Sequence, residues 1–239
     1  MLYDQKKWWG DDYDVRFYLI SKLKRLTNKS ILDIGGGIGI ISSELNSTNF
    51  RINLDISLED LKISKKVDSH IHQICASMTN LPFLKESFDC VVCSNLLEVG
   101  KAIDLENNAV IKEGKINQYP TIERIFLEIS RMLKNNGIMY LSTPNNEYYQ
   151  SNKLDYDELK NSLNSHFPKF SLYFFNTFPR LSRKYRKLNL ANVIPKMISK
   201  LKSDDGLLKI LLKNDDGKSR ESVSFYVEAF KKENKINKE

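Results

Sequence analysis

A cluster of glycines follows a short apolar segment near the start of the chain. Residues 30–34 (SILDI) predict a buried strand, and the next five residues, 35–39, contain four glycines. Glycine adopts positive φ without strain and lets a ligand approach the backbone closely. The helix expected after this turn would add free backbone N–H groups at its amino end. The pattern is typical of nucleotide-like cofactor sites, and a tight turn without a ligand is the alternative.

A second chemical signal is Asp55, which ends the next predicted strand, twenty residues after Gly35. A carboxylate at this place can accept two hydrogen bonds from ribose hydroxyls. Its structural alternative is a charge or cap at the start of a helix over 57–66. A dinucleotide fingerprint would also need glycine at position 40, where this chain has Ile40. The residues therefore indicate a cofactor that contains adenosine, but Asp55 does not distinguish NAD from other such cofactors.

Four segments, in order, resemble sequence motifs of the class I S-adenosylmethionine-dependent methyltransferases, in particular those of methyltransferase types 11 and 12. They span about half of the chain, and their order and spacing are more specific than any one of them. The segments are 32–39 (LDIGGGIG), 53–57 (NLDIS), 76–92 (ASMTNLPFLKESFDCVV) and 128–145 (EISRMLKNNGIMYLSTPN).

The resemblance implies an S-adenosylmethionine site, with S-adenosylhomocysteine as the product. In this family the glycines meet the methionine part, Asp33 orients their loop or reaches the amino group, and Asp55 holds the ribose. Adenine would lie against Ile56, and Asn95 would lie beside the methionine part and the transferred methyl group. The implied cofactor-binding residues are Asp33, Gly35, Gly36, Gly37, Gly39, Asp55, Ile56, Ser77, Met78 and Asn95.

The chain departs from the family pattern at two positions. Ser77 stands where the family usually has an aspartate that accepts a hydrogen bond from adenine, and an uncharged hydroxyl accepts more weakly. Val99 stands where the family's "LEH" turn has histidine. These departures keep open a catalytically degenerate protein that binds without transferring a methyl group.

Methyl transfer from a sulfonium needs alignment and exclusion of water, and a base only when the acceptor is protonated. No motif fixes such a base, so the catalytic residues are unknown. Weak candidates are Glu98, Tyr148 and His166, each with a structural or surface role as the alternative. No histidines and carboxylates have metal-ligand spacing, so no metal is expected.

The elements that must position these residues alternate between strand and helix. Strands are expected at 30–34, 50–55, 71–74, 88–94, 138–142, 170–175 and 223–230, with helices at 13–27, 57–66, 154–164, from the glycine turn to about 45, and from Thr121 to Asn136. This alternation predicts an α/β fold with helices on both faces of a mostly parallel sheet. The resemblance implies a Rossmann-like sheet of seven strands, with the last strand antiparallel and inserted beside the fifth.

A single domain accounts for the length of 239 residues. Its parts are expected to be a lid and helix at 1–30, the cofactor-binding core at 31–176, a basic helical insertion at 177–221, the last strand at 222–232 and a frayed tail at 233–239. Trp8 and Trp9 predict either a lid that touches the substrate or a staple closing the core. Cys90 and Cys93 fall three apart in one strand, so we expect buried thiols on opposite faces.

The net charge of +7 is concentrated in one stretch. Residues 180–213 carry ten Lys and Arg against two Asp, a net of +8, so the other residues sum to −1. Basic amphipathic helices are typical of membrane surfaces. The alternatives here are a docked helical cap with a solvated basic face, or an RNA site, which the sparse aromatic residues disfavour.

The composition bounds the remaining possibilities. No apolar run reaches about 18 residues, and the start lacks the apolar region of a secretory signal. Three cysteines without an export signal indicate a reduced, cytoplasmic protein, with peripheral attachment at an anionic membrane as an addition. We predict transfer of a methyl group to an oxygen or nitrogen of a small, amphiphilic or lipid-like acceptor. An RNA methyltransferase, a dinucleotide oxidoreductase and a non-catalytic binding protein are the alternatives, and the sequence does not give the oligomeric state.

Overall fold

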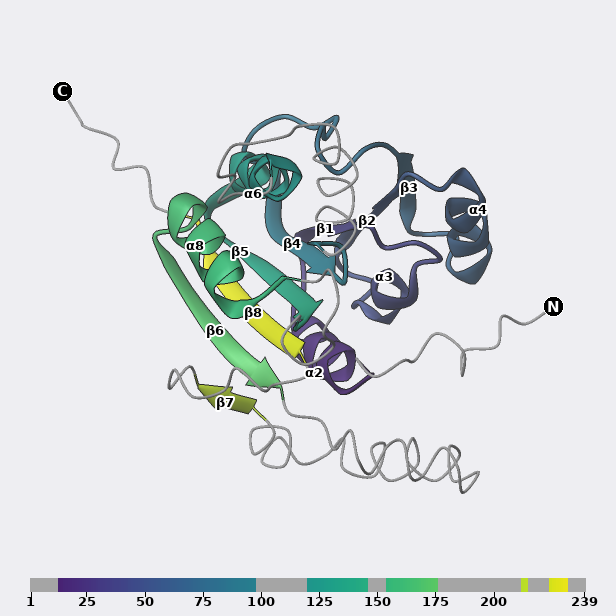
Figure 1. Cartoon of the computed structure of the whole chain (residues 1–239). Coiled ribbons are helices and arrows are strands. Elements are labelled where there is room, and N and C mark those ends of the chain that lie inside the picture. Colours follow the sequence, from purple (N-terminus) through teal and green to yellow (C-terminus); the bar gives the residue numbers. More distant parts are fainter. Residues whose placement is uncertain (1–12, 98–119, 146–153, 176–211, 215–223, 232–239) are drawn as a thin grey trace, which may run out of the picture.

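The computed structural model describes residues 13–97, 120–145, 154–175, 212–214 and 224–231. One sheet forms its centre, in the order β3-β2-β1-β4-β5-β8-β6-β7 (Figure 1). The strands are β1 (Ser30–Ile34), β2 (Phe50–Asp55), β3 (His72–Cys75), β4 (Phe88–Ser94), β5 (Leu133–Pro144), β6 (Lys169–Phe175), β7 (Leu212–Asn214) and β8 (Ser224–Phe230).

The sheet is mixed, and its parallel half holds the predicted motifs. The five strands from β3 to β5 pair in parallel, whereas β8 is antiparallel to both β5 and β6. The expected insertion of the last strand beside the fifth is therefore confirmed, as is the Rossmann-like fold class. The seven expected strands are present, and the three-residue β7 adds an eighth at the edge beside β6.

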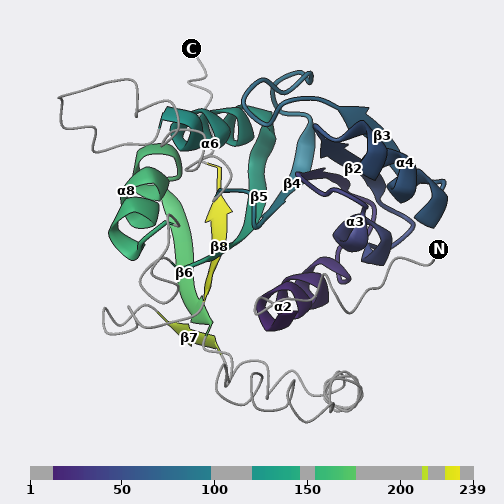
Figure 2. The same ribbon diagram turned by 45° about the vertical axis from the view of Figure 1, so that its right-hand side comes forward.

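Five described helices cover the two faces of the sheet (Figure 2). One face carries α2 (Tyr13–Leu23), α3 (Ile40–Glu44) and α4 (Leu58–Val67), and the other carries α6 (Pro120–Met132) and α8 (Tyr156–His166). Each face has its own apolar cluster, because successive residues of a strand point to opposite sides. On β4, Val91 and Cys93 belong to the cluster beneath α6 and α8, and Cys90 and Val92 belong to the other.

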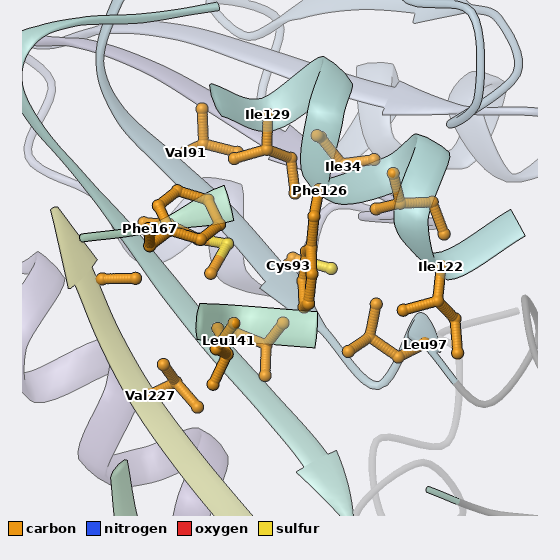
Figure 3. Packing of buried hydrophobic residues seen from close by; sticks show 14 of the residues in the cluster. Ile34, Val91, Cys93, Leu97, Ile122, Phe126, Ile129, Leu141, Phe167 and Val227 are labelled. Carbon is orange, nitrogen blue, oxygen red and sulfur yellow. The ribbon is translucent and has the colours of Figure 1, made fainter. Parts of the chain in front are cut away.

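The larger cluster shows why the amphipathic pattern of residues 121–133 forms a helix that docks. Ile122, Phe126 and Ile129 of α6 point toward the strands, where they meet Val91, Cys93 and Leu141 (Figure 3). Phe167, just after α8, packs edge-on against Phe126, with ring centroids 5.9 Å apart. Burying such side chains stabilises the fold by roughly 1.5–3 kcal/mol each.

Two helix starts follow from local side-chain chemistry. Ser57 caps α4, and its hydroxyl accepts a hydrogen bond from the Asp60 N–H, as the sequence predicts. Asp155 opens α8 with a capping box, in which its carboxylate accepts from the Glu158 N–H and the Glu158 side chain accepts from the Asp155 N–H. Each cap satisfies backbone donors that the first turn of a helix leaves without partners.

One predicted boundary is wrong. Asn136 and Gly137 do not end a helix: α6 ends at Met132, and β5 begins at Leu133. The β4–β5 pairing shifts register after Phe88, which lies opposite Leu133, so that Cys90 lies opposite Ile138. Asn136 takes a positive φ of 60°, and this local bend absorbs the extra residues of β5.

Several predicted parts lie outside the described residues. These include Trp8, Trp9, Glu98, Tyr148 and nearly all of the basic stretch at 180–213. The only described residues of the 177–221 insertion, Leu212–Asn214, form a strand rather than a helix. Of the predicted lid and helix at 1–30, residues 13–30 are described. They include α2, in which the buried Val15, Leu19 and Leu23 pack into the core.

Candidate functional site

The glycine turn lies between the end of β1 and α3, at the carboxyl edge of the parallel strands. Gly35, Gly37 and Gly39 have φ values of 69°, 52° and 78°, in the left-handed region that residues with a Cβ avoid. The Gly35 and Gly36 N–H groups both donate to the Leu54 carbonyl, at 2.8 and 3.2 Å. The turn therefore folds over the end of β2, where Asp55 lies.

Asp55 holds the outer side of this turn. Its Oδ2 accepts from the Gly37 N–H and its Oδ1 from the Ser57 N–H, both at 2.9 Å. Each carboxylate oxygen offers two lone pairs, so both oxygens retain one acceptor site. The arrangement leaves Asp55 able to receive two hydroxyl groups, as ribose binding requires. Ile56 follows it with 76 % of its surface exposed, an apolar side chain available to a ligand.

The inner side of the turn rests on a buried polar layer formed by Asp33, Ser42, Asn53 and Ser64. The Ser42 hydroxyl donates to Asp33 Oδ2 at 2.7 Å, and the Asn53 amide donates to the Gly37 carbonyl at 2.8 Å. Burial raises the pKa of Asp33 and the nearby charge of Asp55 adds to this, so the pKa is about 6 despite the hydrogen bonds from Ser42. Asp33 thus supports the loop from below.

The loop after β3 brings the predicted adenine residues next to Asp55. The Ala76 N–H donates to the Asp55 carbonyl at 3.1 Å. The Ser77 hydroxyl lies 3.0 Å from the Thr79 hydroxyl and accepts from the Thr79 N–H at 3.3 Å. Met78 is partly buried against the core. Ser77 therefore stabilises its own turn, a use that competes with recognition of adenine.

The loop after β4 closes the opposite side of the glycine turn. A Cβ added at Gly35 would lie 2.6 Å from the Leu96 side chain, so the two loops pack tightly. Asn95 takes a positive φ of 54° and its N–H donates to the Ser142 carbonyl at 2.8 Å. Next to it, the Ser94 and Ser142 hydroxyls lie 2.9 Å apart. All ten predicted cofactor residues thus belong to β1, β2 or the loops at one sheet edge.

The described catalytic candidate does not lie at this edge. His166 ends α8, three residues before β6, and β6 begins level with Ile138 near the amino end of the regular β5 pairing. Its Nε2 lies 2.5 Å from Glu123 Oε2 on α6, and its ring meets Phe126 edge-on. This position between two helices fits the structural alternative. Glu98 and Tyr148 lie outside the described residues.

A conspicuous pair in the fourth motif is also structural. Arg131 donates to the carbonyls of Leu81 and Phe83, and Glu128 accepts from the Leu81 N–H. The two side chains form an ion pair at 2.8 Å, and this pair lowers the pKa of Glu128. Together they fasten the 81–87 loop to α6.

The thiols agree with the sequence prediction. Cys90 and Cys93 are buried in the two separate clusters, and burial raises the pKa of both. Cys75 is exposed. Within the described ranges, no group of three or more His, Cys, Asp or Glu could hold a metal ion. Among those same residues, no helix is long and apolar enough to cross a bilayer.

Sequence reasoning missed the polar layer beneath the turn. Ser42, Asn53 and Ser64 come from three elements, and each reads alone as an ordinary polar residue. The available signal was Asn53, a polar residue inside the apolar strand FRINLD and two positions before Asp55, hence on the same face of the strand.

Comparisons with known proteins agree with this geometry. Residues 32–141 match the family model of a methyltransferase domain. An uncharacterized protein of Methanocaldococcus jannaschii is 40% identical over 79 residues, which cover 32% of this chain and about a third (33%) of that relative.

Two solved structures share the fold across nearly the whole chain. One, a methyltransferase and possible histamine N-methyltransferase of Thermotoga maritima, is 16% identical with a TM-score of 0.53, covering 96% of this chain and 95% of that one. The other, phosphoethanolamine N-methyltransferase 2 of Haemonchus contortus with bound S-adenosyl-L-methionine, is 15% identical with a TM-score of 0.56, covering 95% and 56%. The predicted resemblance to the class I S-adenosylmethionine-dependent methyltransferases is confirmed, because residues 32–141 match the methyltransferase-domain model and the chain shares the fold of these solved methyltransferases.

Proposed function

We propose that the chain binds S-adenosylmethionine at the carboxyl edge of β1, β2 and β4 and transfers its methyl group to an oxygen or nitrogen of a small or amphiphilic acceptor. The observation that carries the proposal is Asp55. Its carboxylate fixes the Gly37 and Ser57 N–H groups and still has an acceptor site on each oxygen. It both shapes the turn and remains open to ribose hydroxyls.

The residues at this edge fit the chemical parts of the cofactor. The glycine turn presents backbone without side chains to the methionine part, and Asp33 and Asn95 flank that region from β1 and β4. Exposed Ile56 offers an apolar surface to adenine, and Ser77 and Met78 follow on the neighbouring loop. The neighbour from Haemonchus contortus, which shares this fold, was solved with S-adenosyl-L-methionine.

The bound sulfonium would supply an already activated methyl group. The chain's contribution is therefore to orient the acceptor in line and to exclude water. The hydroxyls of part-buried Ser94 and buried Ser142, with Asn95, form an uncharged part of the sheet edge beside the glycine turn. Because these three residues carry no charge, Asp33 and Asp55 would supply most of the electrostatic attraction for the positively charged sulfonium.

The choice of acceptor draws on the sequence of residues 180–213, nearly all of which lie outside the described part and which carry a net charge of +8. Such a segment favours an anionic or lipid-like acceptor, or contact with an anionic membrane. Sedimentation with anionic liposomes, repeated at high salt, tests this part. Binding that salt weakens supports it, and absence of binding at low salt removes it.

The second candidate is a protein that binds the cofactor without methyl transfer, and the local use of Ser77 favours it. The Ser77 hydroxyl bonds within its own turn, so adenine would be held without the carboxylate usual in the family. If this candidate is correct, S-adenosylhomocysteine binds weakly in the wild type and more tightly in Ser77→Asp.

Calorimetry with S-adenosylmethionine, S-adenosylhomocysteine and NADH tests the proposal. We expect binding of the first two, lost in Asp55→Ala and Gly37→Val. Asp89→Asn, at the opposite end of the strands, serves as the control and should bind as the wild type does. Failure of the wild type to bind either sulfur compound contradicts the proposal, and preference for NADH supports an oxidoreductase.

A further inference from the structure

The Gly37 peptide groups are held by two side chains of β2. The Gly37 N–H donates to Asp55, and the Gly37 carbonyl accepts from the Asn53 side-chain amide at 2.8 Å. Asn53 and Asp55 are two residues apart on one strand, so they project from the same face. Asp55 faces the ligand side, whereas Asn53 is fully buried beneath the turn.

The second donor of the Asn53 amide reaches the adjacent helix. It donates to the Ser64 hydroxyl of α4 at 2.9 Å, so both amide hydrogens have acceptors. The reversed amide would place Oδ1 against the Gly37 carbonyl, acceptor against acceptor, and this fixes the orientation. Asn53 therefore links β2, the glycine turn and α4.

The turn has no room to relax onto this layer. A Cβ added at Gly36 would lie 2.2 Å from Asn53 Oδ1, and one added at Gly39 would lie 2.2 Å from Ser64 Oγ. The backbone thus rests directly on the two side chains that Asn53 connects. Oδ1 of Asn53 is buried without a hydrogen-bond partner, so the hydrogen bonds that this amide makes are the two that it donates, to Gly37 and Ser64.

We propose that Asn53 is a positioning residue, which fixes the glycine turn in its ligand-binding form through the Gly37 carbonyl, with Ser64 as its anchor. This inference rests on the proposed function, because the turn is the part assigned to the methionine end of the cofactor. Asn53 acts through the backbone of Gly37 and does not itself touch the ligand.

The test compares Asn53→Leu with Gln73→Leu in the full chain. Gln73 is the matched control: it lies beside Asn53 in the β2–β3 register, its amide donates to the Ile71 carbonyl, and its Oε1 is also buried without a partner. Amide hydrogen exchange of residues 35–39 is measured without ligand, and S-adenosylhomocysteine affinity by calorimetry. Ser64→Ala is the second variant if Asn53→Leu does not fold.

For Asn53→Leu we expect exchange at 35–39 to accelerate at least about tenfold and affinity to fall about 10- to 100-fold, with both nearly unchanged in Gln73→Leu. Ser64→Ala should give smaller changes in the same direction. Unchanged exchange, or faster exchange with unchanged affinity, overturns the positioning role. If the wild type does not bind S-adenosylhomocysteine, the proposed function fails, and the exchange comparison alone decides whether Asn53 holds the turn.

Discussion

The two ends of β1 hold carboxylates in opposite ways. At the amino end, Asp89 of β4 accepts from the Ser30 N–H at 2.9 Å, the Ser30 hydroxyl at 2.7 Å and the Lys134 ammonium at 2.9 Å. Partial burial opposes ionisation of Asp89, but the Ser30 and Lys134 hydrogen bonds lower its pKa to about 2. At the carboxyl end, Asp33 is fully buried with a hydroxyl donor from Ser42, and its pKa is raised to about 6.

This difference indicates a structural role for the amino end of the strands and a binding role for the carboxyl end. The amino end is saturated with donors, which ties the starts of β1, β4 and β5 together. The carboxyl end contains the buried carboxyl group of Asp33, whose ionisation burial disfavours. It also contains a buried Asn53 oxygen without a hydrogen-bond partner and backbone with positive φ. Groups left in this condition are stable only if the surroundings enforce them, and they are typical of binding sites.

The largest expected effect comes from filling the tight side of the turn. Gly36→Ala would put its Cβ 2.2 Å from Asn53 Oδ1 and 2.7 Å from Asp33 Oδ2. We expect a loss of about 3 kcal/mol of unfolding free energy in urea, together with loss of S-adenosylhomocysteine binding. Gly37→Ala is the matched control, since only Asp55 Oδ2 comes within 4 Å of its Cβ, at 3.9 Å, and the positive φ alone should cost about 1–2 kcal/mol. Equal losses in the two variants would contradict the packing argument.

The next effect is a pH dependence specific to Asp33. The pKa of Asp33 in the folded protein, about 6, exceeds the ordinary value of 3.8. Its contribution to the free energy of unfolding is therefore fully present below about pH 4 and is lost as the pH rises through 6. Asp33→Asn should therefore exceed the wild type in unfolding free energy at pH 8 by at most about 3 kcal/mol, with the difference fading toward pH 4. Urea titrations at both pH values measure it, and parallel pH curves for the two proteins would refute the buried charge.

For Asp89, at the amino end of the strands, the pH dependence of stability has the opposite sign to that of Asp33 and is smaller. The folded pKa of Asp89, about 2, lies below 3.8, so its stabilisation is present above pH 4 and lost as pH falls through 2. Asp89→Asn should lose at most about 2 kcal/mol at pH 7, since the carboxylate is partly exposed, without changing ligand affinity. A reduced ligand affinity in this variant would mean that the two ends are coupled.

The smallest effect is expected at the start of α8, where the capping interactions are local. Asp155→Ala removes the capping box of α8 and should cost about 1 kcal/mol in urea unfolding, with ligand affinity unchanged. A loss above about 3 kcal/mol would show that Asp155 does more than cap the helix.

The contrast also explains what the sequence could and could not predict. The strands 30–34, 50–55 and 88–94 and the Ser57 cap are each determined by neighbours in the chain, and each was predicted at its observed bounds. The glycine turn and Asp55 could be placed at one edge because parallel strands end there. The β5 start was missed because the register shift after Phe88 depends on pairing with another strand.

The polar layer under the turn escaped prediction for the same reason. Asp33, Ser42, Asn53 and Ser64 meet only after the four elements β1, α3, β2 and α4 have packed, and no spacing in the chain relates Ser64 to Gly39. The contacts of His166 could not be predicted either, because Glu123 and Phe126 lie about forty residues away on α6.

Backbone amide NMR during a titration with S-adenosylhomocysteine tests whether the cofactor site lies at the carboxyl edge of the parallel strands. We predict saturable shift changes at Gly35, Gly37, Gly39, Ile56 and Ser77, with the amides of Ser30 and Asp89 unchanged at the far end of the strands. Changes confined to the amino end, or no saturable change at the glycine turn, would contradict the assignment of the cofactor site to the carboxyl edge.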